Sequence, residues 1–152
     1  MNTPLEIADQ LERIAGAGED FVLQADGLAD QWRAVGAGVE TVEPILRFME
    51  GHPEIDYGTP GPLVHFMEEF WGRGYDEEVL ASIKRMPTPH TVWLLNRLIN
   101  GAKSDAERNM LIAAMEQARH SPRAGPETIQ DLEDFLEFQG HNDQGHKPSK
   151  TG

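Results

Sequence analysis

The sequence has no cysteine and no long apolar run, and its first half has few basic residues. Without cysteine the chain can form no disulfide, no thiol nucleophile and no cysteine-ligated metal site. Because no stretch of about 18 consecutive apolar residues occurs, we expect no transmembrane helix. The first ten residues carry Glu6 and Asp9 instead of a basic start and an apolar segment, so they do not resemble a secretory signal. We therefore expect a cytoplasmic protein.

The scarcity of basic residues leaves the first half strongly acidic. Residues 1–80 contain 17 Asp and Glu against 4 Lys and Arg, whereas residues 81–152 contain 9 of each kind. The whole formal net charge of −13 therefore lies in the first half. Such asymmetry is typical of a surface that meets a positively charged partner, and it disfavours binding to nucleic acid or to an anionic membrane. Solubility is the alternative explanation.

Apolar residues recur at helical spacing along nearly the whole chain, and no segment alternates like a strand. The expected helices span residues 4–15, 19–35, 42–50, 62–71, 77–86, 90–100, 105–120 and 126–138. We predict an all-α fold of about eight helices in antiparallel hairpins, arranged as a compact bundle or a short HEAT-like stack. Residues 1–138 would form a single domain. Residues 139–152 have almost nothing apolar to bury, which predicts a disordered C-terminal tail.

Helix starts are marked by capping residues. Thr3-Pro4-Leu5-Glu6 is a capping box with proline at the first helical position, and Thr88-Pro89 begins a helix in the same way. Ser104-Asp105-Ala106-Glu107 has the pattern of a second capping box. Asp76 is predicted to be the N-cap of the helix at residues 77–86. These signals fix the starts of four helices.

A histidine and carboxylate group offers the strongest sign of catalysis or metal binding. His65, Glu68 and Glu69 fall at i, i+3 and i+4, with His52 and Asp56 in the preceding irregular segment. A metal-dependent hydrolase built on His52, Asp56, His65 and Glu69 is one hypothesis. However, the chain has no H-E-x-x-H motif, no G-x-S-x-G turn and no phosphate-binding glycine loop. We therefore expect no catalytic residue, metal or cofactor.

Acidic and aromatic residues are concentrated in a short region around the Pro- and Gly-rich segment. Tyrosine and tryptophan supply rigid contact area at interfaces, and surrounding carboxylates steer a basic partner. The predicted partner-binding residues are Asp56, Tyr57, Glu68, Glu69, Trp71, Tyr75, Asp76, Glu77 and Glu78. Alternatively, the aromatic residues complete the core and the acids are helix N-terminal charges that the helix dipole favours.

Asn96 and Arg97 interrupt the most apolar helix, at residues 90–100. Buried polar groups need partners, so we predict a structural role for both side chains. Arg97 would pair with a carboxylate of the irregular segment, such as Asp56, and attach that segment to the core. Direct partner binding is the alternative.

Two segments carry a resemblance to a known class of proteins. Residues 56–66 (DYGTPGPLVHF) and 87–100 (PTPHTVWLLNRLIN) resemble small helical bacterial immunity proteins of polymorphic or contact-dependent toxin systems. The resemblance implies a cytoplasmic, non-enzymatic protein that binds a toxin domain and blocks it, and it assigns no binding residues. The acidic first half fits independently, because toxin domains that act on nucleic acid are usually basic.

The sequence thus predicts an immunity protein that occludes a basic toxin, such as a nuclease, through its acidic surface. The alternative from another class is a HEAT-like scaffold that joins two cellular proteins. The metal-dependent hydrolase is the third hypothesis.

Overall fold

Helices joined by short loops make up the fold, as the periodicity predicts. The computed structural model describes residues 3–146, with side chains for residues 3–140. In this range the chain forms eight α-helices, two short 3-10 helices at Gly18–Asp20 and Val39–Thr41, and no strand, which confirms the all-α class. The α-helices are α1 (Pro4–Ile14), α2 (Phe21–Ala34), α3 (Val42–Gly51), α4 (Pro62–Glu68), α5 (Tyr75–Arg85), α6 (Pro89–Asn100), α7 (Asp105–Ala118) and α8 (Pro126–His146).

Two of the predicted helix starts are confirmed in detail. The Thr3 hydroxyl accepts the Glu6 backbone N–H at 3.2 Å, and the Glu6 carboxylate accepts the Thr3 N–H at 2.7 Å. Thr88 and Thr91 exchange the same pair of hydrogen bonds at the start of α6, at 3.2 and 3.0 Å. In both helices the proline at the first position has no N–H that would need a partner, so cap and proline act together.

The other two starts differ from the prediction in their bonding. Ser104 caps α7 by accepting the Glu107 N–H at 3.1 Å, but the Glu107 carboxylate accepts the Lys103 N–H at 2.9 Å instead of closing a capping box. Asp76 lies inside α5, which begins at Tyr75. Its carboxylate reaches back to the Gly72 N–H at 2.7 Å. Each acid therefore satisfies a backbone donor of the loop before its helix.

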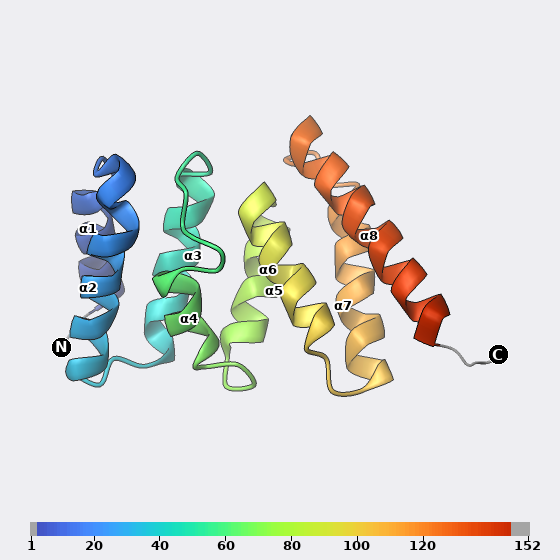
Figure 1. The fold of residues 1–152 in the computed structure, drawn as a ribbon, viewed down its shortest axis with the longest axis horizontal. Helices are drawn as coiled ribbons and strands as arrows, with labels where there is room; N and C mark the ends of the chain where they lie inside the picture. The colour runs from blue at the N-terminus through green and yellow to red at the C-terminus, as the bar shows by residue number, and fades with distance from the viewer. Residues whose placement is uncertain (1–2, 147–152) are drawn as a thin grey trace. The chain divides into compact units, whose positions relative to one another are not determined.

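The chain divides into two compact units, Met1–Ser82 (unit 1) and Ile83–Gly152 (unit 2). In unit 1, α1 and α2 form a hairpin; α1 packs against α3, and α2 packs against α4 (Figure 1). This pairing places the first hairpin beside the next two helices in two layers. The pair of α1 and α2 is a hairpin of the predicted kind.

Aromatic rings fill the core of unit 1. Trp32 is fully buried, its ring lies 5.4 Å from that of Phe66, and its indole N–H donates to the Gln10 side chain at 2.8 Å. Phe21 stacks on Phe48 with ring centroids 6.1 Å apart. These contacts join α2 to α4 and to α3, so the hairpin and the following helices share one core.

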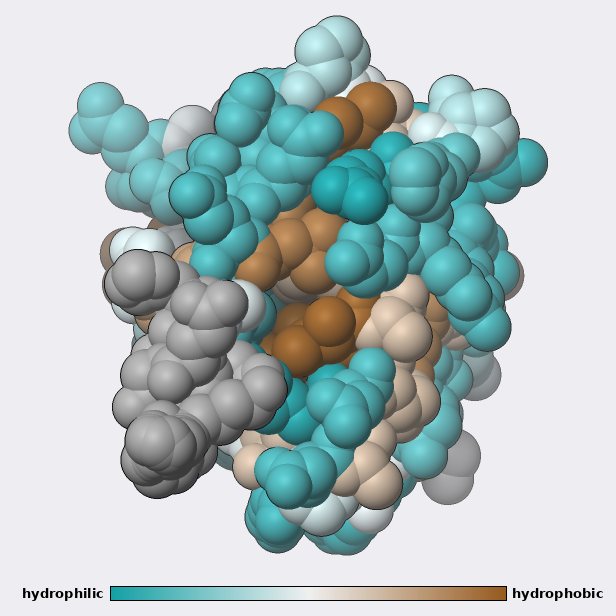
Figure 2. All heavy atoms as spheres, turned by 90° about the vertical axis from the view of Figure 1, so that its right-hand side faces the viewer, coloured by the Kyte–Doolittle hydropathy of each residue, from teal (hydrophilic) through white to brown (hydrophobic). Residues whose placement is uncertain are grey.

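Unit 2 is built around α6, which packs against both α7 and α8. The apolar residues that predict a central helix are buried, namely Val92, Leu94, Leu95, Leu98 and Ile99. Figure 2 shows apolar surface among polar residues on the face of unit 2 that α7 and α8 form. Met110 and Phe138 are the large apolar residues of these helices that stay about half exposed among the described side chains.

The predicted tail does not begin at residue 139, because α8 continues to His146. Gln139 is only 1 % exposed, and its side-chain amide donates to the side-chain oxygens of Asn96 and Asn100, both at 2.8 Å. Arg108 of α7 donates to both the backbone and the side-chain oxygen of Gln139, each at 3.0 Å. Polar partners therefore hold this part of α8. Residues 147–152 of the predicted tail lie outside the described residues.

Candidate functional site

The two tyrosines of the predicted partner-binding set belong to the core. Tyr57 is 2 % exposed, its ring meets that of Phe21 edge-on at 5.6 Å, and its hydroxyl donates to the His52 backbone oxygen at 2.8 Å. Burial, with a smaller contribution from nearby carboxylates, raises the pKa of the Tyr57 phenol. Tyr75 is 0 % exposed. The prediction that both rings contact a partner is therefore corrected: each ring packs inside the chain.

Trp71 is the aromatic residue of that set that keeps some exposure. Its ring is half-buried and lies 6.1 Å from the Tyr75 ring at a tilt of 53°. The loop between α4 and α5 thus leaves Trp71 partly exposed on unit 1. Trp71 is therefore the aromatic residue of the predicted set that can still contact a partner.

The carboxylates of the set divide into bonded and free groups. Asp56 accepts the Gly58 N–H at 2.9 Å, and Glu69 accepts from the Arg33 guanidinium at 2.7 Å. Glu68 is half-buried. The carboxylates of Glu77 and Glu78, on the first turn of α5, make no hydrogen bond or ion pair with the described residues. Glu77 is exposed and Glu78 is half-buried, and both carboxylates are left to meet a partner.

Four exposed acids outside the predicted set belong to the first hairpin. Asp9 lies on α1, Glu19 and Asp20 lie in the connection, and Asp26 lies on α2. None of the four pairs with another described residue. These acids contribute to the charge asymmetry of the sequence, but they lie outside its short aromatic-rich region. The acidic surface of unit 1 is therefore wider than predicted.

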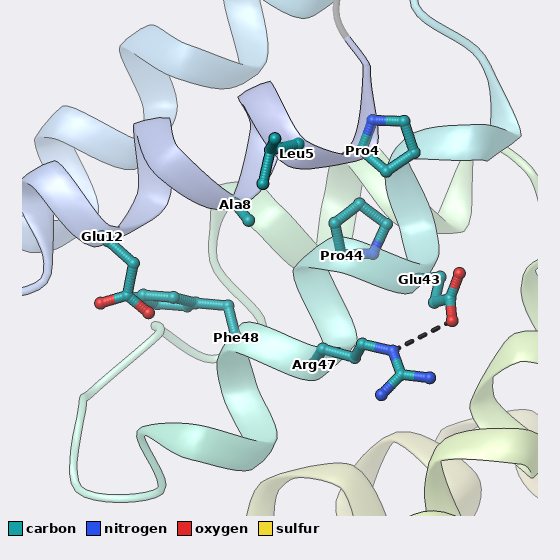
Figure 3. Close-up of a pocket in the computed structure, with 8 residues that line it drawn as sticks. All are labelled: Pro4, Leu5, Ala8, Glu12, Glu43, Pro44, Arg47 and Phe48. Atoms are coloured by element: carbon teal, nitrogen blue, oxygen red, sulfur yellow. Dashed lines mark hydrogen bonds and ion pairs between the residues drawn. The ribbon is translucent and has the colours of Figure 1, made fainter.

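A groove between α1 and α3 has a volume of about 420 Å³. Figure 3 shows side chains of both helices bordering it. Its lining residues are Pro4, Leu5, Ala8, Glu12, Glu43, Pro44, Arg47 and Phe48. Leu5 is 72 % exposed at its rim, and Phe48, 5 % exposed, reaches it from the core. The lining is mostly apolar. None of the predicted partner-binding residues contributes to it.

His52 and its two carboxylate partners lie next to the groove. The ring nitrogens of His52 lie 3.1 Å from Glu12 and 3.4 Å from Glu54, and the ring itself packs on Phe48 at 4.5 Å. Partial burial on its own would lower the pKa of His52, but the hydrogen bonds and charges of Glu12 and Glu54 raise it above its usual value. Glu12 is thereby held beside the Phe48 ring (Figure 3).

An ion pair lies near Pro44 in the same groove. Arg47 Nε donates to Glu43 Oε2 at 3.0 Å across one turn of α3, and both side chains are largely exposed (Figure 3). Arg47 is the cation that lines the groove, and its charge is already matched by Glu43. A ligand in the groove would therefore contact a mostly apolar lining, with the carboxylate of Glu12 on α1 and that of Glu43 on α3.

The residues of the hydrolase hypothesis have separate roles. His52 pairs with Glu12 and Glu54, Asp56 accepts a backbone N–H, and Glu69 binds Arg33, while His65 is exposed on α4. Across the residues that the structure describes, no three His, Asp or Glu side chains gather closely enough to hold a metal ion. The structure does not bring the predicted metal set together.

Asn96 has the structural environment that the sequence predicts. It is buried, and its side-chain oxygen accepts from Gln139 at 2.8 Å. The Arg97 guanidinium lies over the Trp93 ring at 5.2 Å. The predicted pair between Arg97 and Asp56 stays a prediction, to be checked by thermal unfolding of Arg97→Ala, for which we expect a lower melting temperature.

None of the helices in the described range combines the length and apolarity needed to cross a lipid bilayer. No family model, curated protein or solved structure matches the chain.

Proposed function

We propose that this chain is a non-enzymatic immunity protein that binds a basic toxin domain and occludes it. One observation carries the proposal: residues 1–80 hold 17 carboxylates and 4 basic side chains, and many of those carboxylates are exposed. Two of the basic residues are already paired inside unit 1, Arg33 with Asp30 and Glu69, and Arg47 with Glu43. The surplus negative charge is therefore available to a partner.

The surplus suits a partner that normally meets phosphate groups. A nuclease domain presents Lys and Arg where its substrate backbone lies, and carboxylates at similar positions compete for those side chains. Charges of this kind mainly accelerate encounter, and salt screens them over about 8 Å at physiological ionic strength. We expect the association rate constant to fall by at least tenfold between low and high salt. An unchanged rate constant would contradict steering by the acidic surface.

Co-expression tests the function directly. The chain is expressed with the product of the gene immediately upstream, and growth and co-purification are measured. Rescue of growth together with a stable complex is the expected result. If the neighbour's product is not toxic and no complex forms, the immunity proposal fails.

Charge reversals then locate the contact surface. Glu77→Lys with Glu78→Lys changes two free acids of unit 1, and we expect slower association and weaker protection. Glu133→Lys with Glu137→Lys is the matched control, because both are exposed acids of α8 and the change in net charge is identical. Equal effects of the two double variants would mean that net charge, rather than the surface of unit 1, governs binding.

A scaffold that joins two cellular proteins is the second candidate, and the helix pairing of unit 1 favours it. The pairing of α1 with α3 and of α2 with α4 is the layered arrangement found in helical repeat proteins. A scaffold would not neutralise the product of a neighbouring gene. Co-expression therefore separates the two candidates.

A further inference from the structure

We propose that the groove between α1 and α3 is a docking site for an amphipathic segment of the basic partner, which inserts an apolar side chain between Leu5 and Phe48. Lysine or arginine residues flanking that side chain would lie beside Glu12 and Glu43. This inference rests on the proposed function for the class of its partner. It adds a binding contact on α1 and α3 that the sequence does not single out.

The apolar lining is the first argument. Leu5 leaves most of its side chain in water, although Ile7 and Leu11 of the same helix are fully buried. Pro4, Ala8 and Pro44 continue the same lining. A volume of about 420 Å³ lies in the range of pockets that bind ligands. The groove can therefore accept apolar side chains without rearrangement of the core.

Charge complementarity decides which partner fits. Glu12 and Glu43 lie at separate points of the groove, and Asp9 is exposed one position after Ala8 on α1. Arg47, the cation in the lining, is paired with Glu43. Glu12 pairs with His52, and Asp9 has no described partner, so the acids around the groove outnumber the one cation of its lining. An acidic segment would add to this surplus of negative charge, whereas a basic segment offsets it. The groove thus selects the same sign of charge as the rest of unit 1.

Both walls of the groove are held before any partner arrives. The capping box of Thr3 and Glu6 fixes the start of α1 directly beside Leu5. His52 packs on Phe48 and holds the carboxylate of Glu12 at the same time. Since less freedom is lost on binding, a preorganised groove binds more tightly than a mobile one.

A labelled peptide tests the groove on the full chain. The probe is a fluorescein-labelled helical peptide of about 14 residues with leucine and phenylalanine on one face and lysines on both sides. The control peptide carries glutamate in place of every lysine. Fluorescence anisotropy should show binding of the lysine peptide and none of the glutamate peptide. Absence of binding by the lysine peptide would overturn the proposal.

A pair of matched leucine variants identifies the site of binding. Leu5→Ser should weaken binding of the lysine peptide by about tenfold. Leu23→Ser is the control, because Leu23 on α2 is 71 % exposed and does not line the groove. Equal affinity of the two variants would show that the peptide binds the acidic surface in general, which overturns the proposal.

The lack of native cysteine allows the groove to be blocked chemically. Ala8→Cys introduces a single thiol in the lining, and Gln24→Cys introduces one on the exposed side of α2. After reaction with a bulky maleimide, the variant labelled at position 8 should lose at least tenfold in affinity and the variant labelled at position 24 should not. Binding that survives at position 8 contradicts docking in the groove.

Co-expression with the upstream product distinguishes failure of this inference from failure of the proposed function. If Leu5→Ser protects cells as well as the unsubstituted chain, the immunity function stands and the groove proposal fails. If the unsubstituted chain gives no protection but binds the lysine peptide through Leu5, the immunity function fails and the groove remains a site for another basic partner.

Discussion

Gln139 gives the sharpest test of the structure, because the sequence and the fold make opposite predictions for it. The sequence assigns it to a disordered tail, where replacement by alanine would change nothing. In the structure Gln139→Ala removes the hydrogen bonds to Asn96 and Asn100 and one side-chain bond from Arg108. Neutral hydrogen bonds contribute about 1 kcal/mol each and those to a charged group about 2 kcal/mol. Because water reaches the exposed Asn100, we expect a loss of about 3 kcal/mol.

Thermal and urea unfolding followed by circular dichroism measure this loss. For a chain of this size about 3 kcal/mol corresponds to a fall of roughly 6–12 °C in Tm. Gln130→Ala is the matched control on the same helix, since the Gln130 amide donates only to exposed Asp134 at 3.0 Å. It should cost less than about 0.5 kcal/mol. If both variants unfold alike, α8 does not dock through Gln139 and the described end of unit 2 is wrong.

Two further predictions concern the segment between α3 and α4. His52→Gln should destabilise the chain most between about pH 5 and 6.5 and less as pH rises through the folded-state pKa, because a raised pKa means that folding favours the protonated form of His52. Urea unfolding of both chains from about pH 5 to 9 measures the difference, and a difference that stays constant up to pH 9 would contradict the prediction. Gly61→Ala should cost about 3 kcal/mol or more, since Gly61 has φ +87° and an added Cβ would meet the Tyr57 backbone oxygen at 1.7 Å. Gly51→Ala, whose Cβ meets nothing within 4 Å, should leave the melting temperature nearly unchanged.

Helices were predictable because their signals are local. A capping threonine followed by proline, as at Thr3 and Thr88, restricts the backbone whatever the rest of the chain does. The apolar spacing of α6 likewise identifies a central helix without reference to its partners. Fold class and most helix bounds therefore follow from residues that are neighbours in sequence.

The fate of individual side chains was not predictable, because distant residues decide it. Tyr57 is a tyrosine among acidic residues, as is common at interfaces, yet its ring packs against Phe21 of another helix and is buried. Gln139 reads as a surface residue, although Asn96 supplies a buried acceptor for its amide. Leu5 follows the apolar period of α1, but the neighbouring helix leaves it exposed at the groove. The groove itself joins residues about forty positions apart, which no local pattern reveals.

The surplus charge of unit 1 has a consequence for stability as well as for binding. Like charges that find no partner repel one another, and net charge far from zero destabilises a folded chain. Added salt screens this repulsion, so the melting temperature of the free protein should rise between about 10 and 300 mM NaCl. The same salt weakens attraction to a basic partner, so affinity should fall over this range. Replacing Asp20 and Asp26 by asparagine should reduce both effects, because both acids are exposed and lack a described partner. If the melting temperature of the unsubstituted chain does not change with salt, the carboxylates are too far apart to repel one another. That result would also contradict steering of a partner by their combined field.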